Sequence, residues 1–590
     1  EDDLLWLQGD DEDAAVPDKD TDIKPRHYGG KAHGFERDAN GDDGSQKRVG
    51  AYGEELDEGE DEDYDDLDDE DFADEMSTEW NLRKCAAAAL DVLAVRFGAD
   101  LLNVLLEPLK TKLWSDDWLQ RESGILALGA MAEGPEPVTW ESQGSESDRR
   151  SAGCIDAIEP HLPTLVPYLI NTLNDPKLLR MVLDNNKRVQ EAGCSAFATL
   201  EEDAGPELAP YLEPVLRSLV FAFEKYQNKN MLILYDAVGT LADAVGSALQ
   251  NPTYVEILMP PLLKRWSKLK DDDHDLIPVL KCLASVTIAM GPAFLSYATP
   301  IFDRCHTIVH TSLLQYQAYQ QNLEMDEPDR SFLVVALGLL SGLTQGLRTA
   351  LESHISGSQP NLLELLIICL KHPHAAVRQS GYALVGDMAM NCFPLLRPQV
   401  SSIMQEIIAQ LDPEPKVEFI SACNNAAWAV GEIALQFGRD EADFQQWVHP
   451  LVSRLIPILL HSKAPRSLHE NAAVSIGRIG LMHPALVAPR LPEFAEAWCK
   501  ALNEISDNEE KDSAFRGFCT LVQMNLAGIT KSLLWFCNAI GKWNRPSPEL
   551  NDMFQQLLNE LREHDSVCWK AHVVKISPVI QELLVTRYGG

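Results

Sequence analysis

Eight segments of the chain repeat one pattern: a small residue near the middle, then an apolar run, then usually Gly or Asn. From Trp80 onward the apolar spacing is helical, and no convincing run of alternating strand pattern occurs. The central small residues are Ala198, Gly239, Ser285, Ser341, Gly386, Gly431, Gly477 and Cys519, with successive spacings of 41, 46, 56, 45, 45, 46 and 42. A period in the low to middle forties made of two helices is typical of HEAT-type repeats.

The repeat predicts an all-α fold, an α-solenoid (superhelix) of HEAT-type helix-pair repeats. Each pair buries its apolar face only against its neighbours, and the small residues let the paired helices approach closely. The expected result is a curved rod whose concave surface is lined by the second helix of each pair.

Two intervals are irregular. The 56-residue interval contains residues 313–330 (LLQYQAYQQNLEMDEPDR), which predict a long loop or an extended helix. Between Gly129 and Ala198 no intact repeat occurs, and residues 135–153 are polar and structureless in pattern. An error in the assembled sequence or a real deletion would each explain this gap.

An acidic tract precedes the repeats. Residues 54–75 hold sixteen carboxylates and no basic residue, so the tract cannot pack and acts as a tethered polyanion. The chain starts without Met, and we expect it to begin inside a longer protein. The expected divisions are 1–7 as the end of a preceding repeat helix, 8–79 as a disordered acidic loop, 80–134 as HEAT repeats, 135–182 as an irregular, incomplete repeat, and 183–590 as HEAT repeats.

Charge and cysteine usage restrict the partners. The formal net charge is −40, more than half of it in residues 1–79, which disfavours nucleic acid and favours basic polypeptides. The twelve cysteines lack CxxC spacing and lie mostly in apolar helical runs, for example Cys369, Cys423 and Cys519, as reduced core thiols of an intracellular protein would. We find no secretory signal and expect no apolar run of the roughly 18 residues that a membrane span needs.

One second helix carries an unusual tryptophan. On a helical wheel of residues 420–434, one side is apolar and the other is a stripe that includes Asn425, Trp428 and Glu432. Either another helix covers Trp428 or its ring is an exposed platform for a ligand. We favour the platform, because Trp often anchors interfaces.

Other second helices present acids. Asp236, Thr240 and Asp243 share one stripe, as do Glu191, Ser195, Ala198 and Glu202, and Asp91 lies opposite the apolar face of its helix. Acids from three neighbouring helices on one concave surface would hold an arginine- or lysine-bearing peptide through charge-assisted hydrogen bonds. Charge alone does not distinguish this hypothesis from the interpretation that these acids form an ordinary solvated face.

Enzyme chemistry has little support. The chain has no P-loop, GxSxG, HExxH or GxGxxG motif at a strand–helix turn, and we expect no cofactor. The acidic run 271–275 (DDDHD) lacks EF-hand spacing, so a solvated loop is favoured over a metal site.

Several blocks also resemble a known family. EWNLRKCAAAALDVLA (79–94), WLQRESGILALGAMAEG (118–134), DNNKRVQEAGCSAFATLEE (184–202), KNMLILYDAVGTLAD (229–243), CNNAAWAVGEIA (423–434) and DNEEKDSAFRG (507–517) are similar to transportins, the karyopherin-β2 nuclear import receptors of the importin-β family. The resemblance runs from the acidic segment to the C-terminus and lacks the family's N-terminal repeats.

The resemblance implies a non-enzymatic receptor that shuttles through nuclear pores between cytoplasm and nucleus. Its partners would be cargo proteins with basic proline–tyrosine nuclear localisation signals, Ran-GTP and nucleoporins, without direct nucleic acid or membrane insertion. Residues 8–79 look like the family's acidic loop, which ejects cargo when Ran-GTP binds.

Carried over by position, two cargo subsites are implied. Ala88, Asp91 and Leu126 would take the proline–tyrosine end, and the residues facing the cargo arginine would be Ser195, Thr199, Glu202, Asp236, Thr240 and Asp243. The second subsite, for an upstream basic or hydrophobic segment, would comprise Val334, Gln379, Ile420, Asn425, Trp428, Asn471 and Val474.

Three departures from the family weaken these expectations. A helix that should follow Arg180 is missing, Gly338 and Gln345 stand where the family has acids, and the repeats that supply the main Ran contact are absent. Two other functions stay open: a HEAT-repeat scaffold for complex assembly, and an acidic histone chaperone.

Overall fold

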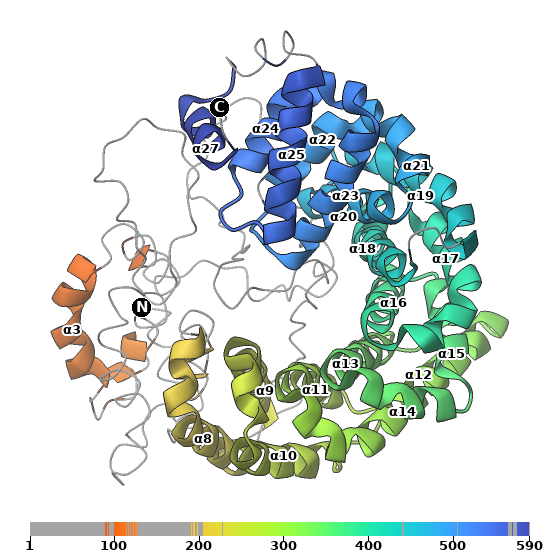
Figure 1. Ribbon diagram of the computed structural model, residues 1–590. Coiled ribbons are helices and arrows are strands. Elements are labelled where there is room, and N and C mark those ends of the chain that lie inside the picture. Colours follow the sequence, from red (N-terminus) through yellow and green to blue (C-terminus); the bar gives the residue numbers. More distant parts are fainter. Residues whose placement is uncertain are drawn as a thin grey trace.

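Two layers of helices follow one curved path through the chain (Figure 1). The computed structural model describes residues 205–588, apart from 227, 439–441, 504, 565–568 and 570–574, together with parts of 89–127 and 190–198. Within these residues every regular element is a helix. The prediction of an all-α solenoid is confirmed.

The concave layer consists of the second helices, which we call the inner helices. They are α9 (Asn228–Val245), α11 (Leu276–Met290), α13 (Ser331–Leu347), α16 (Ala375–Leu396), α18 (Ile420–Gln436), α20 (Arg466–Met482) and α23 (Glu509–Met524). Successive inner helices pack extensively against each other, and they line the inside of the curve in Figure 1.

The outer layer covers the convex side. It consists of α8 (Leu212–Lys225), α10 (Pro252–Trp266), α12 (Leu295–Gln321), α14 (Glu352–Gly357), α15 (Leu362–Leu370), α17 (Val400–Gln410), α19 (Ala442–Leu460), α22 (Leu491–Asn503) and α24 (Leu533–Gly541). The remaining α-helices are α3 (Ala99–Leu113), α21 (Pro484–Val487), α25 (Pro548–His564) and α27 (Pro578–Tyr588).

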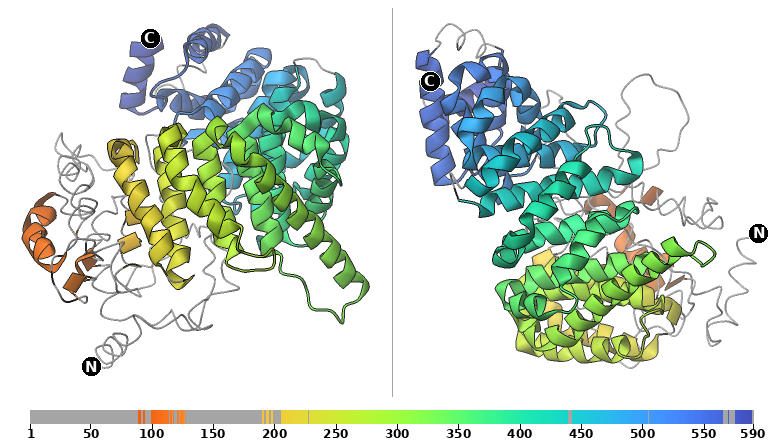
Figure 2. Two further views of the ribbon diagram at one scale, coloured as in Figure 1. Left: turned by 90° about the horizontal axis from the view of Figure 1, so that it is seen from below. Right: turned by 90° about the vertical axis from the view of Figure 1, so that its right-hand side faces the viewer.

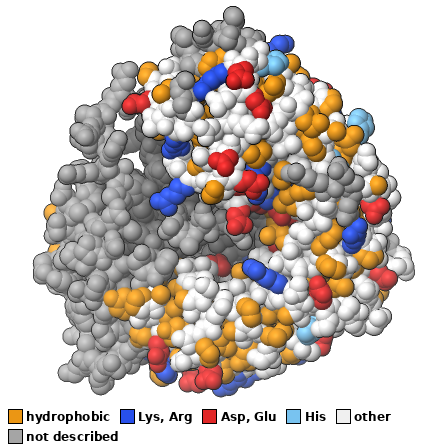
Figure 3. All heavy atoms as spheres, in the orientation of Figure 1, with side chains coloured by type: hydrophobic (Ala, Val, Ile, Leu, Met, Phe, Trp, Pro, Cys, Tyr) orange, Lys and Arg blue, Asp and Glu red, His pale blue; other side chains and the backbone are white. Residues whose placement is uncertain are grey.

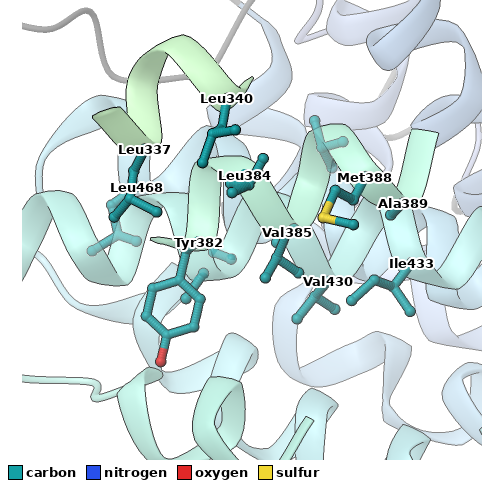
Figure 4. Close-up of a cluster of buried hydrophobic side chains, with 14 of the residues drawn as sticks. Leu337, Leu340, Tyr382, Leu384, Val385, Met388, Ala389, Val430, Ile433 and Leu468 are labelled. Atoms are coloured by element: carbon teal, nitrogen blue, oxygen red, sulfur yellow. The ribbon is translucent and has the colours of Figure 1, made fainter. Parts of the chain in front are cut away.

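Apolar side chains from successive inner helices form a continuous core. Figure 4 shows Leu337 and Leu340 of α13 near Leu384 and Val385 of α16, with Val430 of α18 close by. These side chains are at most 1% exposed. Full burial of one such side chain contributes about 1.5–3 kcal/mol, so each repeat is stabilised chiefly by its neighbours.

The small residues of the repeat mark the places where inner helices meet. A Cβ added at Gly477 of α20 would lie 2.6 Å from the carbonyl oxygen of Ala514 in α23, and one at Gly517 would lie 1.8 Å from the carbonyl oxygen of Gly477. The close approach is therefore between successive inner helices, whereas we expected it between the two helices of one pair.

The 56-residue interval is explained by α12, which has 27 residues and ends at Gln321. Its last turns and the loop that follows project from the body of the solenoid in the left view of Figure 2. Glu327 of this loop bonds the ring of His374 at 2.6 Å, which ties the projection to the start of α16. The prediction of a long loop or an extended helix is confirmed, because the interval contains both an extended helix and a loop.

By length and hydropathy, three helical stretches of the described chain could cross a membrane: Asn230–Gln250, Leu276–Gln321 and Ser331–Gly357. The expectation that no apolar run reaches this length was wrong. Their apolar windows are 50%, 61% and 72% buried inside the solenoid, as inner helices covered on several sides would be. The second stretch is not one straight helix, because the chain turns at Gly291, whose φ is 50°.

The cysteines are core residues, as expected. Nine free cysteines lie in the described residues, and all nine are buried. Burial raises the pKa of the Cys423 thiol to about 12, so this thiol is protonated and inert at neutral pH.

The acidic tract, residues 1–79 as a whole and the incomplete repeat at 135–182 lie outside the described residues. Their expected divisions stay predictions.

Candidate functional site on the inner helices

Side chains of both charges surround the central hollow of the solenoid, with acids prominent among them (Figure 3). Of the sixteen sequence-predicted site residues, those that the structure describes lie on the inner helices. Six of those residues lie outside the described part of the chain: Ala88, Asp91, Leu126, Ser195, Thr199 and Glu202. The other ten can be placed.

Three of the ten lie on α9. Asp236 and Thr240 are half-buried, and Asp243 is exposed. The Asp243 carboxylate accepts a hydrogen bond from the Ser285 hydroxyl of α11 at 3.2 Å. The first inner helices therefore present carboxylates that water, and hence a ligand, can reach.

The other seven are distributed over four successive inner helices. Val334 lies on α13, Gln379 on α16, Ile420, Asn425 and Trp428 on α18, and Asn471 and Val474 on α20. The Asn425 amide donates to the Gln379 carbonyl oxygen at 3.1 Å, and the Asn471 amide donates to Asn424 Oδ1 at 2.8 Å. These two amides join each helix to the preceding one.

The expectation of an exposed indole was wrong. Trp428 is 6% exposed, and Asn425, Asn471 and Val474 are at most 1% exposed. The indole occupies space left by Gly386 of α16, where an added Cβ would lie 2.0 Å from Trp428 Cζ3. Its Nε1–H donates to Glu510 Oε1 of α23 at 3.0 Å. Neighbouring helices thus cover Trp428, which was the alternative that we did not favour.

Glu510 belongs to a buried network of ions that the sequence did not reveal. Arg478 of α20 bonds Glu432 of α18 through Nη1 and Ser513 through Nε, the latter at 2.9 Å. Its Nη2 lies 3.7 Å from Glu510 Oε1. The side chains of Arg478 and Glu432 are each 5% exposed, and that of Glu510 is 18% exposed.

The network holds two carboxyl groups for one guanidinium group. Burial raises the pKa of the Glu510 carboxyl to about 7, the Glu432 charge adds to this rise, and Arg478 opposes it. At neutral pH the net charge of this cluster is therefore −1 when Glu510 is ionised and zero when Glu510 is protonated.

A helical wheel could not find this cluster, because its members come from three helices and Trp428 is 82 positions from Glu510. The available signal was weaker: Arg478 is a basic residue within an otherwise apolar run of its repeat (SIGRIG), and such a residue needs a partner when buried.

A cavity of about 430 Å³ lies where the turn before α18 meets the turn before α20. It is lined by Glu414, Pro415, Ile420, His461, Ser462, Lys463, Ala464 and Pro465. Ile420, one of the predicted site residues, forms part of its wall.

The acidic run at 271–275 is a structural loop. Asp271 bonds Arg304 Nε at 2.6 Å, and the same guanidinium donates to the carbonyl oxygens of Trp266 and Leu269 at 2.7 Å each. Among the described residues no group of three His, Cys, Asp or Glu side chains could hold a metal ion.

Comparison with known proteins agrees with this architecture. The family model described as "Importin subunit beta-1-like, TPR repeats" matches residues 176–410. Transportin-1 of Homo sapiens is 40% identical over 625 residues, and Importin subunit beta-2 of Schizosaccharomyces pombe is 41% identical over 639 residues. Both alignments cover all of this chain, which spans 64% and 65% of those relatives.

Solved structures share the fold at low sequence identity. A crystal structure of importin beta has a TM-score of 0.56 at 16% identity, covering 88% of this chain and 64% of that one. Kap121p bound to Nup53p has a TM-score of 0.58 at 13% identity, covering 87% and 51%.

The chain is thus a HEAT-type solenoid and, at about 40% identity along its whole length, a homologue of Transportin-1 and of Importin subunit beta-2. Relatives that match along its whole length include proteins named Transportin-1 and Importin subunit beta-2.

Proposed function

We propose that the chain is the cargo-binding part of a nuclear import receptor, and that its inner helices bind basic proline–tyrosine nuclear localisation signals. The observation that carries this proposal is the 40% identity to Transportin-1 along the entire chain. The layer of inner helices supports it, because acids on α9 and buried polar groups on α18, α20 and α23 follow one concave surface.

The acids of α9 are the contacts proposed for the arginine of the signal. Asp243 is exposed and Asp236 is half-buried, so both can meet a guanidinium group without rearrangement of the helix. A carboxylate forms two parallel hydrogen bonds with arginine, which fixes the orientation of the peptide.

The second subsite takes the upstream segment of the signal. Val334 and Gln379 are half-buried and accessible, whereas the indole of Trp428 must move before it can contact a peptide. Binding at this subsite therefore includes a local rearrangement.

The proposal includes Ran-GTP and nucleoporins as partners, and release of cargo by the acidic loop of residues 8–79. It also includes shuttling between cytoplasm and nucleus, without enzymatic activity. The relatives that align with the whole chain are named as transportins and as importin subunit beta-2, and a structural neighbour was solved with Nup53p. A receptor that passes through nuclear pores needs each of these partners.

Fluorescence anisotropy with a fluorescein-labelled basic peptide ending in proline–tyrosine tests the proposal. We expect Asp243→Lys to weaken binding by about 2 kcal/mol or more, the usual size for a charged interface anchor. Glu256→Lys on α10 is the matched control, because it makes the same charge change at an exposed position of the outer layer. An equal loss of affinity in both variants would indicate only a general effect of charge. Failure of the unaltered protein to bind the peptide would contradict the proposed function.

A further inference from the structure

Three buried acceptors on successive inner helices lack a donor. Among the described residues, Asn425 Oδ1 of α18, Asn471 Oδ1 of α20 and Glu510 Oε2 of α23 are buried and have no hydrogen-bond partner. A buried acceptor without a donor costs free energy that a partnered one does not. Each of these three inner helices therefore holds a buried acceptor that could take a further donor.

The same region is also short of positive charge. Glu432 and Glu510 share the single guanidinium of Arg478, which bonds Glu432 and Ser513 and lies on the Oε1 side of Glu510. Among the described residues, Arg478 is the cation that pairs with Glu510. A buried carboxylate is favourable only when paired, so a second cation would stabilise this cluster.

Trp428 covers the carboxyl group. Its Nε1–H donates a hydrogen bond to Glu510 Oε1, and its ring packs against Gly386 on the other side. The N–H is a single neutral donor, whereas a guanidinium group brings a positive charge and can form two parallel hydrogen bonds with a carboxylate. A cation that reaches Glu510 can therefore replace the indole.

We propose that Glu510 is the binding site for the guanidinium group of an arginine, and that Trp428 covers this site until the arginine enters. The inference rests on the proposed function, since the arginine belongs to a peptide bound on the inner helices. It adds to that function a carboxylate from α23 that lies outside the predicted subsites.

Arginine fits this site better than lysine. Its planar group can bond a carboxylate through two parallel N–H donors, and it is less strongly hydrated than an ammonium group. It also stacks on aromatic rings, so the displaced indole becomes a cation–π partner. The charged groups that act on Glu510 are Arg478 from α20 and Glu432 from α18.

The first test uses a labelled peptide with one arginine upstream of proline–tyrosine, and the same peptide with lysine in its place. We expect Glu510→Gln to bind the arginine peptide about tenfold more weakly and to lose the preference for arginine over lysine, as removal of one charge-assisted bond implies. Glu509→Gln is the matched control, because Glu509 is the exposed neighbour in the same helical turn. Equal affinities in Glu510→Gln and the unaltered protein would overturn the inference while leaving the proposed function standing.

The second test needs no localisation signal. In protein with 15N-labelled tryptophan, Trp428→Phe assigns the Trp428 indole N–H resonance. We expect N-acetyl-arginine amide to shift this resonance in the unaltered protein and in Glu509→Gln, but not in Glu510→Gln, and the neutral citrulline amide to have no effect. A shift that persists in Glu510→Gln, or that citrulline reproduces, would overturn the inference. Failure of the peptide to bind while this shift occurs would instead contradict the proposed function alone.

Discussion

The indole nitrogen of Trp428 and the carboxyl group of Glu510 lie 3.0 Å apart, although 82 residues separate them along the chain. The bond skips a repeat, since α20 lies between α18 and α23 in the order of inner helices. A contact of this kind couples three repeats that would otherwise meet only their nearest neighbours. Four predictions follow from this coupling and from the proposed function.

Gly386→Ala should displace the indole of Trp428. The added methyl group would lie 2.0 Å from Cζ3, so either the ring or α16 must shift. We expect the free energy of unfolding to fall by about 1–3 kcal/mol, as for other overpacked cores. Urea denaturation measures this change, and Gly338→Ala is the control, because Gly338 is an exposed helical glycine with nothing within 4 Å of an added Cβ. The control should be unchanged or more stable by up to about 1 kcal/mol.

Arg478→Met should be among the most destabilising single changes in the inner layer. It removes the guanidinium that holds Glu432 and leaves two carboxyl groups facing each other in a buried site. Breaking a buried pair from one side costs about 3–5 kcal/mol. Adding Glu432→Gln to this variant should restore part of the loss. Arg217→Met on α8 removes an exposed pair with Glu213 and should cost less than about 1 kcal/mol. Similar losses at both arginines would contradict the network.

The stability of the protein should depend on pH through Glu510. The folded carboxyl keeps its proton up to a pKa of about 7, whereas the unfolded chain releases it near 4.5. Between these values the folded state binds more protons, so the contribution of Glu510 to stability is complete below about 4.5 and is lost as the pH rises toward 7. We expect the urea midpoint of the unaltered protein to fall relative to that of Glu510→Gln as the pH rises across this window. A difference that is constant with pH would mean that the carboxyl group titrates in its ordinary range.

In the proposed function the acidic tract competes with cargo binding and is not a cargo contact, so deletion of residues 8–76 should leave the affinity for the basic peptide equal or make it tighter. Anisotropy titrations of the two proteins at two salt concentrations measure this effect. A large loss of affinity on deletion would support a chaperone that binds basic partners through the tract itself.

Sequence reasoning predicted the fold well because a solenoid is determined by contacts between adjacent repeats. Gly386, Gly431 and Gly477 recur at nearly constant spacing, and each lies within an inner helix as expected. The period alone therefore identified the concave layer.

The candidate site was less predictable. The wheel correctly grouped Asn425, Trp428 and Glu432 on one stripe of α18, but it treated everything outside that helix as solvent. In the structure, Gly386 makes space on one side and Glu510 supplies an acceptor on the other, so the stripe is buried. Such packing depends on helices from other repeats, and no pattern within one helix contains that information.

The contact between Gly477 and Gly517 limits how the arch can deform. The backbones of α20 and α23 already touch there, and no side chain can yield to bring them closer. Tighter curvature at this point is therefore blocked. Any change of curvature at this point must therefore open the arch rather than close it further.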